Sequence, residues 1–311
     1  MPDARIPHSK PYLYVERQFY RLLRKAYKAS LKLRREKRPS SYPYITGDSF
    51  RALADHIFDE TCTFDPRSVK RGDIVFTSSV RMHEFFQTMH PRITAQYILI
   101  QHNGDCETDE RVLPFIDDKI IRFYAQITTI RHPKITPIPI GINNMHHGVD
   151  GFRWLMKRKL PEAKLPRVFY HFYVGTNPKE REPAQVYFDS LPTMDTIHSF
   201  IGYGSYKAIL GSYMFTASPP GNTLGSHRTW EALYLRTIPI VKRSADAESC
   251  AELGLPLWII NDWHELGAYD TQMLSRKYAE MIADARFEAL YMPYWEDRIK
   301  TDQRALRGSA E

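Results

Sequence analysis

Residues 215–243 place a cation, an anion and two glycines between two apolar runs, in a pattern suited to binding a phosphate. The segment is FTASPPGNTLGSHRTWEALYLRTIPIVKR. Gly221 follows two prolines and can adopt φ > 0, so a non-repetitive loop is expected there. Ser226 is a good N-cap for a helix that begins at about His227. In an open α/β sheet such a loop lies at the carboxyl ends of the strands, where backbone N–H groups and a helix N-terminus bind anions.

Arg228 and Glu231 supply the charged groups of this segment. Arg228, in the first turn, can donate two hydrogen bonds to a phosphate. Glu231 lies on roughly the same face, and helical side chains lean toward the N-terminus, so its carboxylate can accept from a ribose diol. In the alternative interpretation, Ser226 only caps the helix and Arg228 only forms a local pair with Glu231. We favour a ligand site because all these features fall in phase between two strands.

The same segment resembles the C-terminal signature of the exostosin-like glycosyltransferases. The match covers Ser218-Pro219, Gly221-Asn222, His227-Arg228, Trp230-Glu231-Ala232-Leu233-Tyr234-Leu235 and Ile238-Pro239-Ile240-Val241. It extends to Gly175-Thr176-Asn177-Pro178, Arg181-Glu182-Pro183 and Asn261-Asp262-Trp263, and more loosely over the first half of the chain. Proteins of this family have the two-lobed GT-B fold and transfer a sugar from a nucleotide sugar without a metal, generally with inversion.

The resemblance implies that Arg228 contacts the donor diphosphate and that Glu231 contacts the ribose. The other residues expected at the donor site are Gly221, Asn222, Ser226, His227, Thr176 and Asn177, with Lys179 and Arg181 as additional cations. The nucleotide sugar is a substrate, so no cofactor is expected. This chain has Arg236-Thr237 where the family usually has a small Gly-Cys-like pair, at a helix C-terminus where the change should not disturb the site.

Candidates for a catalytic base follow an apolar run in the first half of the chain. An inverting transfer needs one base to deprotonate the acceptor hydroxyl. Residues 97–103 predict a strand that ends in polar groups, and His102 and Asp105 are the two candidates there. For Asp105 an ordinary turn aspartate is the alternative. Asp48 is a third candidate, although a helix N-cap is the favoured interpretation of that residue.

Asp105-Cys106-Glu107 also admits a different interpretation, as the acidic metal-holding pair of the GT-A glycosyltransferases. The donor segment, however, lies on a separate and later α/β unit, which is the GT-B arrangement. We therefore predict no metal. For the adjacent His146 and His147 we expect a hinge or acceptor-contact role.

Short apolar runs that alternate with helical stretches predict parallel sheets covered by helices on both faces. The expected strands are 73–79, 97–103, 120–126, 135–141, 168–176, 213–218, 238–241 and 258–261. The expected helices include 49–59, 80–88, 109–113, 178–188, 206–212, 227–235 and 275–301. Together they predict an α/β protein with two Rossmann-like lobes of the GT-B type, a basic N-terminal helix and a long C-terminal helix.

The 311 residues are accordingly divided into four segments. Residues 1–38 form a basic amphipathic helical leader, and residues 39–155 form an N-terminal α/β lobe on the acceptor side. Residues 156–275 form a C-terminal α/β lobe on the donor side, and residues 276–311 form the C-terminal helix and tail.

The leader holds almost all of the unbalanced charge. It contains twelve Lys and Arg residues and three acidic residues, so it carries +9, and the rest of the chain carries −2 of the net +7. Its apolar residues recur at helical spacing among the cations. The helix can therefore lie on an anionic membrane surface, or pack on the protein body with a solvated charged face. Nucleic acid is not expected as a partner, because the body offers no extended basic groove.

Composition favours a cytoplasmic protein. The three cysteines, Cys62, Cys106 and Cys250, are widely spaced and include no CxxC pair, which argues against a disulfide framework or a zinc site. The first residues contain no apolar stretch of a secretory signal, and no run approaches the length of a membrane span. We expect a glycosyltransferase of polysaccharide biosynthesis in the cytoplasm or on the cytoplasmic face of a membrane, with a glycan or glycolipid acceptor. The alternative is a non-catalytic nucleotide-sugar or glycan-binding protein on the same scaffold.

Overall fold

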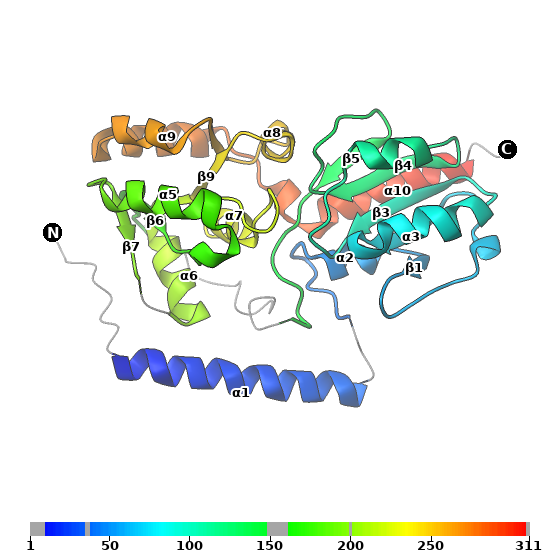
Figure 1. The fold of residues 1–311 in the computed structure, drawn as a ribbon, viewed down its shortest axis with the longest axis horizontal. Helices are drawn as coiled ribbons and strands as arrows, with labels where there is room; N and C mark the ends of the chain where they lie inside the picture. The colour runs from blue at the N-terminus through cyan, green and yellow to red at the C-terminus, as the bar shows by residue number, and fades with distance from the viewer. Residues whose placement is uncertain (1–9, 35–37, 148–160, 199–200, 309–311) are drawn as a thin grey trace.

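The computed structural model describes residues 10–34, 38–147, 161–198 and 201–308. Within these ranges the chain forms two lobes, each built on a parallel sheet of five strands with helices packed on it. The lobes stand side by side, and helix α1 (Lys10–Arg34) lies along both of them (Figure 1). The predicted α/β class with two lobes is confirmed. The predicted boundary between residues 155 and 156 lies outside the described residues.

The N-terminal sheet has the strand order β1-β2-β3-β4-β5. Its strands are β1 (His56–Phe58), β2 (Asp73–Ser78), β3 (Tyr97–His102), β4 (Ile120–Gln126) and β5 (Ile135–Ile138). Alternate side chains point to opposite faces. Leu99 packs with the short helix α3 (Met82–Glu84) and the π-helical turn that follows it, whereas Ile98 packs on the other face with Trp295. The sheet is thus covered on both sides, as its apolar runs predict.

The expected helix 49–59 is only partly correct. Helix α2 spans Gly47–Arg51 and is followed by strand β1, which pairs in parallel with β2. Thr46 is the N-cap, and its side chain accepts a hydrogen bond from Ser49 N at 3.0 Å. The N-cap interpretation of Asp48 is therefore wrong. The β-branched and aromatic run His56–Phe58 forms a strand because it completes the edge of the sheet.

The C-terminal sheet has the order β10-β9-β8-β6-β7. Its strands are β6 (Leu165–Tyr170), β7 (Met194–Thr196), β8 (Tyr213–Ala217), β9 (Ile238–Lys242) and β10 (Trp258–Ile260), and its helices are α5 (Pro178–Asp189), α6 (Tyr203–Ser212), α7 (His227–Tyr234), α8 (Ala245–Glu252) and α9 (Thr271–Ala283). The chain leaves β6 toward one edge and returns to β8 on its other side. The strand order therefore changes direction between β6 and β8, the position at which doubly wound sheets bind ligands.

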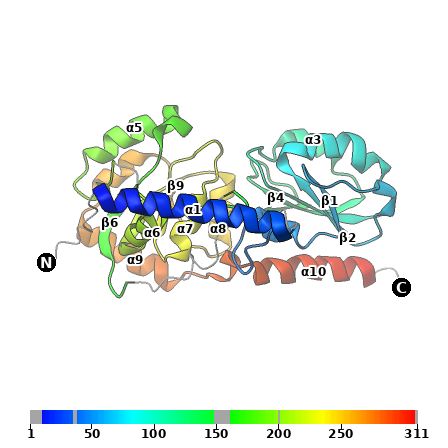
Figure 2. The ribbon, with the colours of Figure 1, turned by 90° about the horizontal axis from the view of Figure 1, so that it is seen from below.

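The C-terminal helix expected near 275–301 is divided into α9 and α10 (Met292–Gly308). Pro293 has no backbone N–H to donate inside a continuous helix, but it fits the first turn of a new one. Helix α10 belongs to the N-terminal lobe, where Trp295 and Ile299 are fully buried. Figure 2 shows α10 along the lower edge of that lobe, whereas α9 lies on the other lobe.

The two lobes share an apolar core next to their cleft. One hydrophobic cluster joins Ile45 and Phe50 of the N-terminal lobe to Trp230 and Leu233 of α7. Tyr234 strengthens this contact, because its hydroxyl accepts a hydrogen bond from Ile45 N at 3.0 Å and donates one to Leu290 O. The packed core fixes the lobes relative to each other and so positions the loops that face across the cleft.

Candidate functional site

A cavity of about 490 Å³ lies at the carboxyl ends of β6 and β8, where the C-terminal sheet changes direction. Its wall includes seven of the eight residues predicted for the donor site, namely Thr176, Gly221, Asn222, Ser226, His227, Arg228 and Glu231. Asp105, a candidate base, lines the same cavity from the N-terminal lobe. The structure therefore brings together residues that lie far apart in the sequence.

The N-terminus of α7 opens into this cavity without a side-chain cap. Ser226 occupies the N-cap position, but its side chain makes no capping hydrogen bond. The capping that the sequence suggested for Ser226 is wrong in this respect. The first turn of a helix leaves several backbone N–H groups without intrahelical partners, so it offers them to an anion in the cavity.

Arg228 is an unpaired cation at this helix end. Its Nε and Nη1 atoms are buried and have no hydrogen-bond partner among the described residues, and it forms no ion pair with any of them. The local pair with Glu231 that a merely structural role would require is therefore not formed. The guanidinium carbon lies 5.9 Å from the centroid of the Phe172 ring. Arg228 as a whole is half-buried, but its two buried nitrogen atoms without hydrogen bonds are costly, and a bound anion would supply acceptors for them.

Arg181 makes the surroundings of Arg228 more positive, whereas burial favours the neutral form of His171. Arg181 is 4% exposed and donates to three backbone oxygens, of Tyr173, Pro219 and Pro220, rather than to a carboxylate. Burial, and then the charge of Arg228, lower the pKa of Arg181 to about 10. Burial also lowers the pKa of His171, and Arg228 adds to this effect. The cavity therefore has an excess of positive charge beside Arg228 and Arg181.

Glu231 is held on the α6 side of the cavity. It is 7% exposed, and its Oε1 accepts a hydrogen bond from the Tyr203 hydroxyl at 3.0 Å. Tyr206, one turn further along α6, also lines the cavity, and its buried hydroxyl lies close to Glu231 and Arg228. This end of the cavity thus presents a carboxylate and a hydroxyl, both suited to the alcohols of a sugar ring.

The loop before α5 supports the site but contributes less than expected. Strand β6 ends at Tyr170 rather than at Thr176, because its pairing with β7 ends at Tyr170 and Thr196. Thr176 lies in a 3₁₀ turn and reaches the cavity. Asn177 does not line the first cavity. Its Nδ2 instead donates a hydrogen bond to Gly221 O at 3.1 Å. Its place is behind the loop that carries Gly221.

Two hydrogen bonds connect the loop between β8 and α7 to the N-terminal lobe across the cleft. Asn222 donates from Nδ2 to Asp105 Oδ2 at 3.0 Å. His227 Nδ1 lies 2.8 Å from the carbonyl oxygen of Gly141 and donates its proton there. Asp105 is exposed, and it lines a second cavity as well, so its carboxylate lies between the two lobes.

His102, unlike Asp105, is buried, and both nitrogens of its ring form hydrogen bonds. It is 2% exposed, its Nδ1 accepts from Asn103 N at 2.7 Å, and its Nε2 donates to Pro139 O at 3.1 Å. Burial lowers the pKa of His102 to about 4. Both ring nitrogens are therefore occupied in a neutral imidazole, which leaves Asp105 as the stronger of the two candidate bases.

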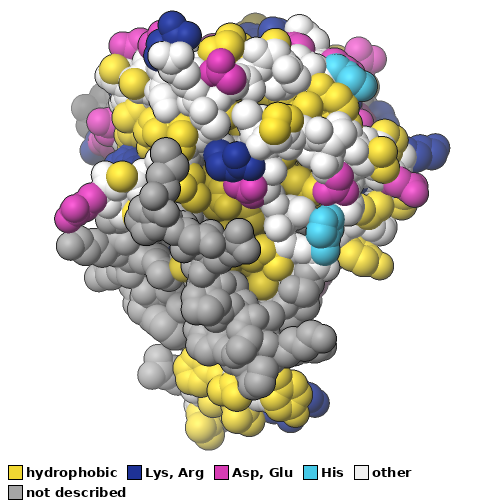
Figure 3. All heavy atoms as spheres, turned by 90° about the vertical axis from the view of Figure 1, so that its left-hand side faces the viewer, with side chains coloured by type: hydrophobic (Ala, Val, Ile, Leu, Met, Phe, Trp, Pro, Cys, Tyr) yellow, Lys and Arg dark blue, Asp and Glu magenta, His cyan; other side chains and the backbone are white. Residues whose placement is uncertain are grey.

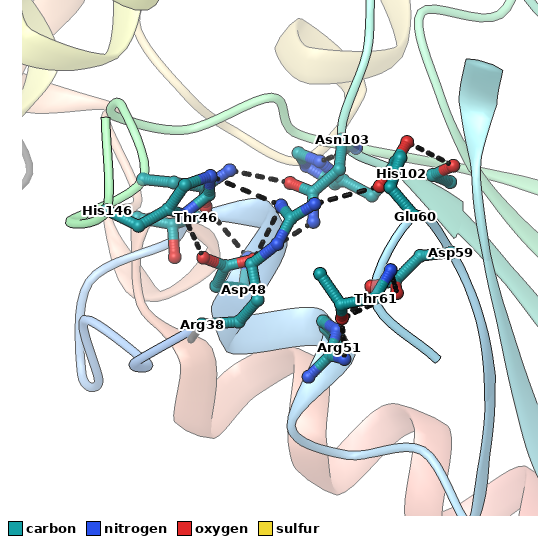
Figure 4. Close-up of polar contacts among 12 residues, drawn as sticks. Arg38, Thr46, Asp48, Arg51, Asp59, Glu60, Thr61, His102, Asn103 and His146 are labelled. Atoms are coloured by element: carbon teal, nitrogen blue, oxygen red, sulfur yellow. Dashed lines mark hydrogen bonds and ion pairs between the residues drawn. The ribbon is translucent and has the colours of Figure 1, made fainter. Parts of the chain in front are cut away.

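The second cavity, of about 640 Å³, lies on the N-terminal side and borders the first at Asp105, Ile140 and His227. A polar network stands at its wall (Figure 4). Asp48 is fully buried, accepts from Asn103 Nδ2 at 3.0 Å and pairs with His146 Nδ1 at 2.7 Å.

Arg38 closes this network from the other side. Its Nη1 lies 3.5 Å from Asp48 Oδ1, and its Nη2 donates to Glu60 Oε2 at 2.8 Å. His147 lines the cavity beside His146. The network fixes the turn at Asn103, whose φ of +61° starts the loop that carries Asp105.

No group of three His, Cys, Asp or Glu side chains that could hold a metal ion occurs among the described residues. Metal-independent transfer stays a prediction. Sequence analysis missed His171, Tyr203 and Tyr206. The position of His171, directly after β6, was a usable signal because ligands bind at strand carboxyl ends. The two tyrosines lie on α6, and no pattern in the sequence predicts that this helix packs beside the cavity.

Arg236 also differs from the signature without reaching the site. It adopts a φ of +56°, a conformation that glycine takes most easily, and the following residue, Thr237, donates its N–H to Ala232 O at 2.9 Å to end α7. The guanidinium of Arg236 packs over the ring of Phe287 at 3.3 Å. Arg236 and Thr237 thus lie at the C-terminus of α7, and neither lines the first cavity.

No protein-family model matches the sequence, and no curated protein matches it. Among solved structures, an α,α-trehalose 6-phosphate synthase from Burkholderia multivorans is similar with a TM-score of 0.40 and 11% identity, over 77% of this chain and 73% of that one. The trehalose-6-phosphate synthase OtsA gives a TM-score of 0.40 and 11% identity, over 75% and 72%. The glycotransferase of kitacinnamycin gives 0.32 and 14%, over 76% and 72%. These values assign no family, so function is argued from the site.

Proposed function

We propose that this protein is a GT-B-type glycosyltransferase that transfers a sugar from a nucleotide-sugar donor to a hydroxyl of a glycan or glycolipid acceptor. One observation carries the proposal: the unpaired Arg228 guanidinium stands at the open N-terminus of α7, in a cavity at the switch point of the sheet. This combination suits a diphosphate, which is a dianion with oxygens placed for several N–H donors. Glu231, in the same cavity, suits the ribose.

The geometry also suggests how the chemistry proceeds. Asp105 takes the proton of the acceptor hydroxyl, whose oxygen forms the new bond to the anomeric carbon. The bond from that carbon to the diphosphate breaks, and the leaving diphosphate takes the electron pair. Arg228 and the N-terminus of α7 stabilise the charge that develops there. A single displacement of this kind inverts the anomeric centre and uses no metal. A first cavity for the donor and a second cavity for the acceptor would suit transfer onto a growing polysaccharide.

Thermal stabilisation by a panel of nucleotide sugars and free nucleoside diphosphates tests the site. A ligand at about 100 times its dissociation constant adds roughly 2.7 kcal/mol to the free energy of unfolding. Arg228→Ala and Glu231→Ala should each abolish most of this gain. Arg243→Ala and Glu252→Ala are matched controls, since both side chains are exposed or half-buried on the same lobe and neither lines the cavity.

Unchanged nucleotide affinity in both Arg228→Ala and Glu231→Ala would disprove the assignment of the first cavity as the nucleotide site. A non-catalytic binding protein would give the same binding data but neither donor hydrolysis nor transfer to an added glycan. Transfer in the presence of a chelator, compared with transfer after addition of Mg²⁺ or Mn²⁺, tests metal independence. Loss with the chelator and recovery with the metal would contradict that part of the proposal.

A further inference from the structure

Helix α1 has three distinct faces, and only one of them packs on the protein. Five of the half-buried or buried residues follow each other at intervals of three or four positions: Glu16, Tyr20, Leu23, Tyr27 and Leu31. Glu16 fixes this face, because its carboxylate accepts hydrogen bonds from the backbone N of Ser205 at 3.0 Å and from its hydroxyl at 2.8 Å. The leader therefore does pack on the body, which was one of the two alternatives for it.

A second face of α1 is apolar and exposed. Val15, Phe19, Leu22 and Leu33 are 64%, 54%, 65% and 86% exposed, and Ala26 is exposed in line with them. These positions also recur at helical spacing, so they form one continuous row along the helix. Figure 3 shows hydrophobic side chains with a Lys or Arg beside them at the bottom of the molecule, where α1 lies.

A third face carries cations. Arg21, Lys25, Lys28 and Lys32 follow each other at intervals of four, three and four positions, and all are exposed. None of the four forms an ion pair with a described residue. At 100° per residue, the centre of this row lies about 120° around the helix from the centre of the apolar row, on the side away from Glu16. Within the helix, Glu16 is the one acidic residue, and its carboxylate is engaged with Ser205.

We propose that α1 binds the surface of an anionic lipid bilayer, with its apolar row inserted at the level of the headgroups and its cation row on the lipid phosphates. An apolar row flanked by Lys and Arg on a helix of this length is the arrangement of helices that lie in a membrane interface. None of the described helices is both long and apolar enough to cross a bilayer. Nucleic acid would pair with the cations but would leave the apolar row in water.

The attachment of α1 gives this membrane contact a defined orientation. Glu16 holds the N-terminal turn of α6, the helix whose Tyr203 and Tyr206 line the first cavity. Beyond the other end of α1, Arg38 reaches Asp48 and Glu60 at the second cavity. The helix thus runs along the C-terminal lobe and ends at the near side of the N-terminal lobe (Figure 2), so one bound helix sets the direction in which both cavities face the bilayer. The inference is independent of the reaction in the cleft.

Sedimentation of the full chain with lipid vesicles tests the proposal. Vesicles of phosphatidylcholine containing about 30% phosphatidylglycerol should bind the protein at low salt, and vesicles of pure phosphatidylcholine should bind it far less. Lys25→Glu with Lys28→Glu should weaken binding by at least about 30-fold. Phe19→Ser with Leu22→Ser should weaken binding to a similar extent, because the apolar row then no longer inserts.

Matched double variants on other surfaces serve as controls and should bind as the wild type does. Arg67→Glu with Arg276→Glu makes the same charge change at exposed sites outside α1, and Leu113→Ser with Val186→Ser removes two exposed apolar side chains elsewhere. Nucleotide stabilisation should be the same in all variants, which separates this test from that of the proposed function. Equal binding to both kinds of vesicle, retained binding by either α1 variant, or binding of nucleic acid without binding of vesicles would overturn the proposal.

Discussion

Asn222 of the donor loop donates a hydrogen bond to Asp105 across the cleft, with Nδ2 and Oδ2 separated by 3.0 Å. This bond connects the loop between β8 and α7 to the loop that follows β3. It places the carboxylate of Asp105 beside the first cavity, the proposed donor site, while the residue also lines the second cavity, the proposed acceptor side. A base that serves an acceptor hydroxyl has to stand at this boundary.

Asp105→Asn should therefore leave donor binding intact and remove transfer. General base catalysis contributes about 10²- to 10⁴-fold, so kcat should fall by roughly this factor while nucleotide affinity changes little. Asn222→Ala should reduce kcat to a smaller extent, because Asp105 keeps its charge but loses the group that orients it. Steady-state transfer assays and nucleotide titrations measure the two effects. Asp118→Asn, at a fully exposed carboxylate of the same lobe, is the control, and unaltered kcat in Asp105→Asn would exclude this residue as the base.

Arg228→Met should make the ligand-free protein more stable while abolishing nucleotide binding. The native guanidinium has two buried nitrogen atoms without partners, and a methionine of similar length carries no such cost. We expect the free energy of unfolding in urea to rise by about 1–2 kcal/mol. Arg243→Met, where the arginine pairs with Glu248 at 2.7 Å, should show no such gain. A less stable Arg228→Met protein would mean that the guanidinium is satisfied by its own surroundings.

The sequence predicted more of the lining of the first cavity than of the second, and the reason is physical. The segment around Arg228 and Glu231 is local, so strand, loop and helix are all specified by neighbouring residues and their turn chemistry. By contrast, Asp48 contacts His146 and Asn103, which lie far away along the chain. No local pattern encodes such contacts, and an N-cap was the natural interpretation of Asp48.

The same reasoning applies to the elements of the fold. Strands β1 and β7 have three residues each and form because a longer neighbour pairs with them. They were missed because a run of this length carries almost no periodicity. The division of the C-terminal helix had a visible signal in Pro293. Its return to the N-terminal lobe depends on the pocket that receives Trp295, which only the assembled sheet provides.

The buried imidazole of His102 should make stability depend on pH. In the unfolded chain this histidine takes up a proton at its ordinary pKa of 6.5, whereas in the folded protein its pKa is about 4. Between these values the unfolded state binds more protons, so the free energy of unfolding falls as the pH decreases from 6.5 to 4. The contribution of this group is about 3 kcal/mol. Urea unfolding of the wild type and of His102→Gln at several pH values isolates this contribution, because the contributions of all other titrating groups cancel in the difference between the two proteins. Identical pH profiles of the free energy of unfolding would contradict the lowered pKa of His102.

Gly47→Ala should disturb the acceptor side without touching any cavity residue that binds the donor. A Cβ at this position would overlap with the side-chain oxygen of Asn103 and with Nδ1 of His102. The turn that leads to Asp105 would have to move, at a cost of about 1–3 kcal/mol in the free energy of unfolding.

We expect a lower kcat in Gly47→Ala together with unchanged nucleotide affinity, measured by transfer assays and thermal stabilisation. Gly308→Ala is the matched control, because a Cβ there meets no atom within 4 Å. It should leave both properties as they are in the wild type. If Gly47→Ala were as stable and as active as Gly308→Ala, the contacts of Asn103 would not determine where Asp105 stands, and the position of the base would have to be attributed to Asn222 alone.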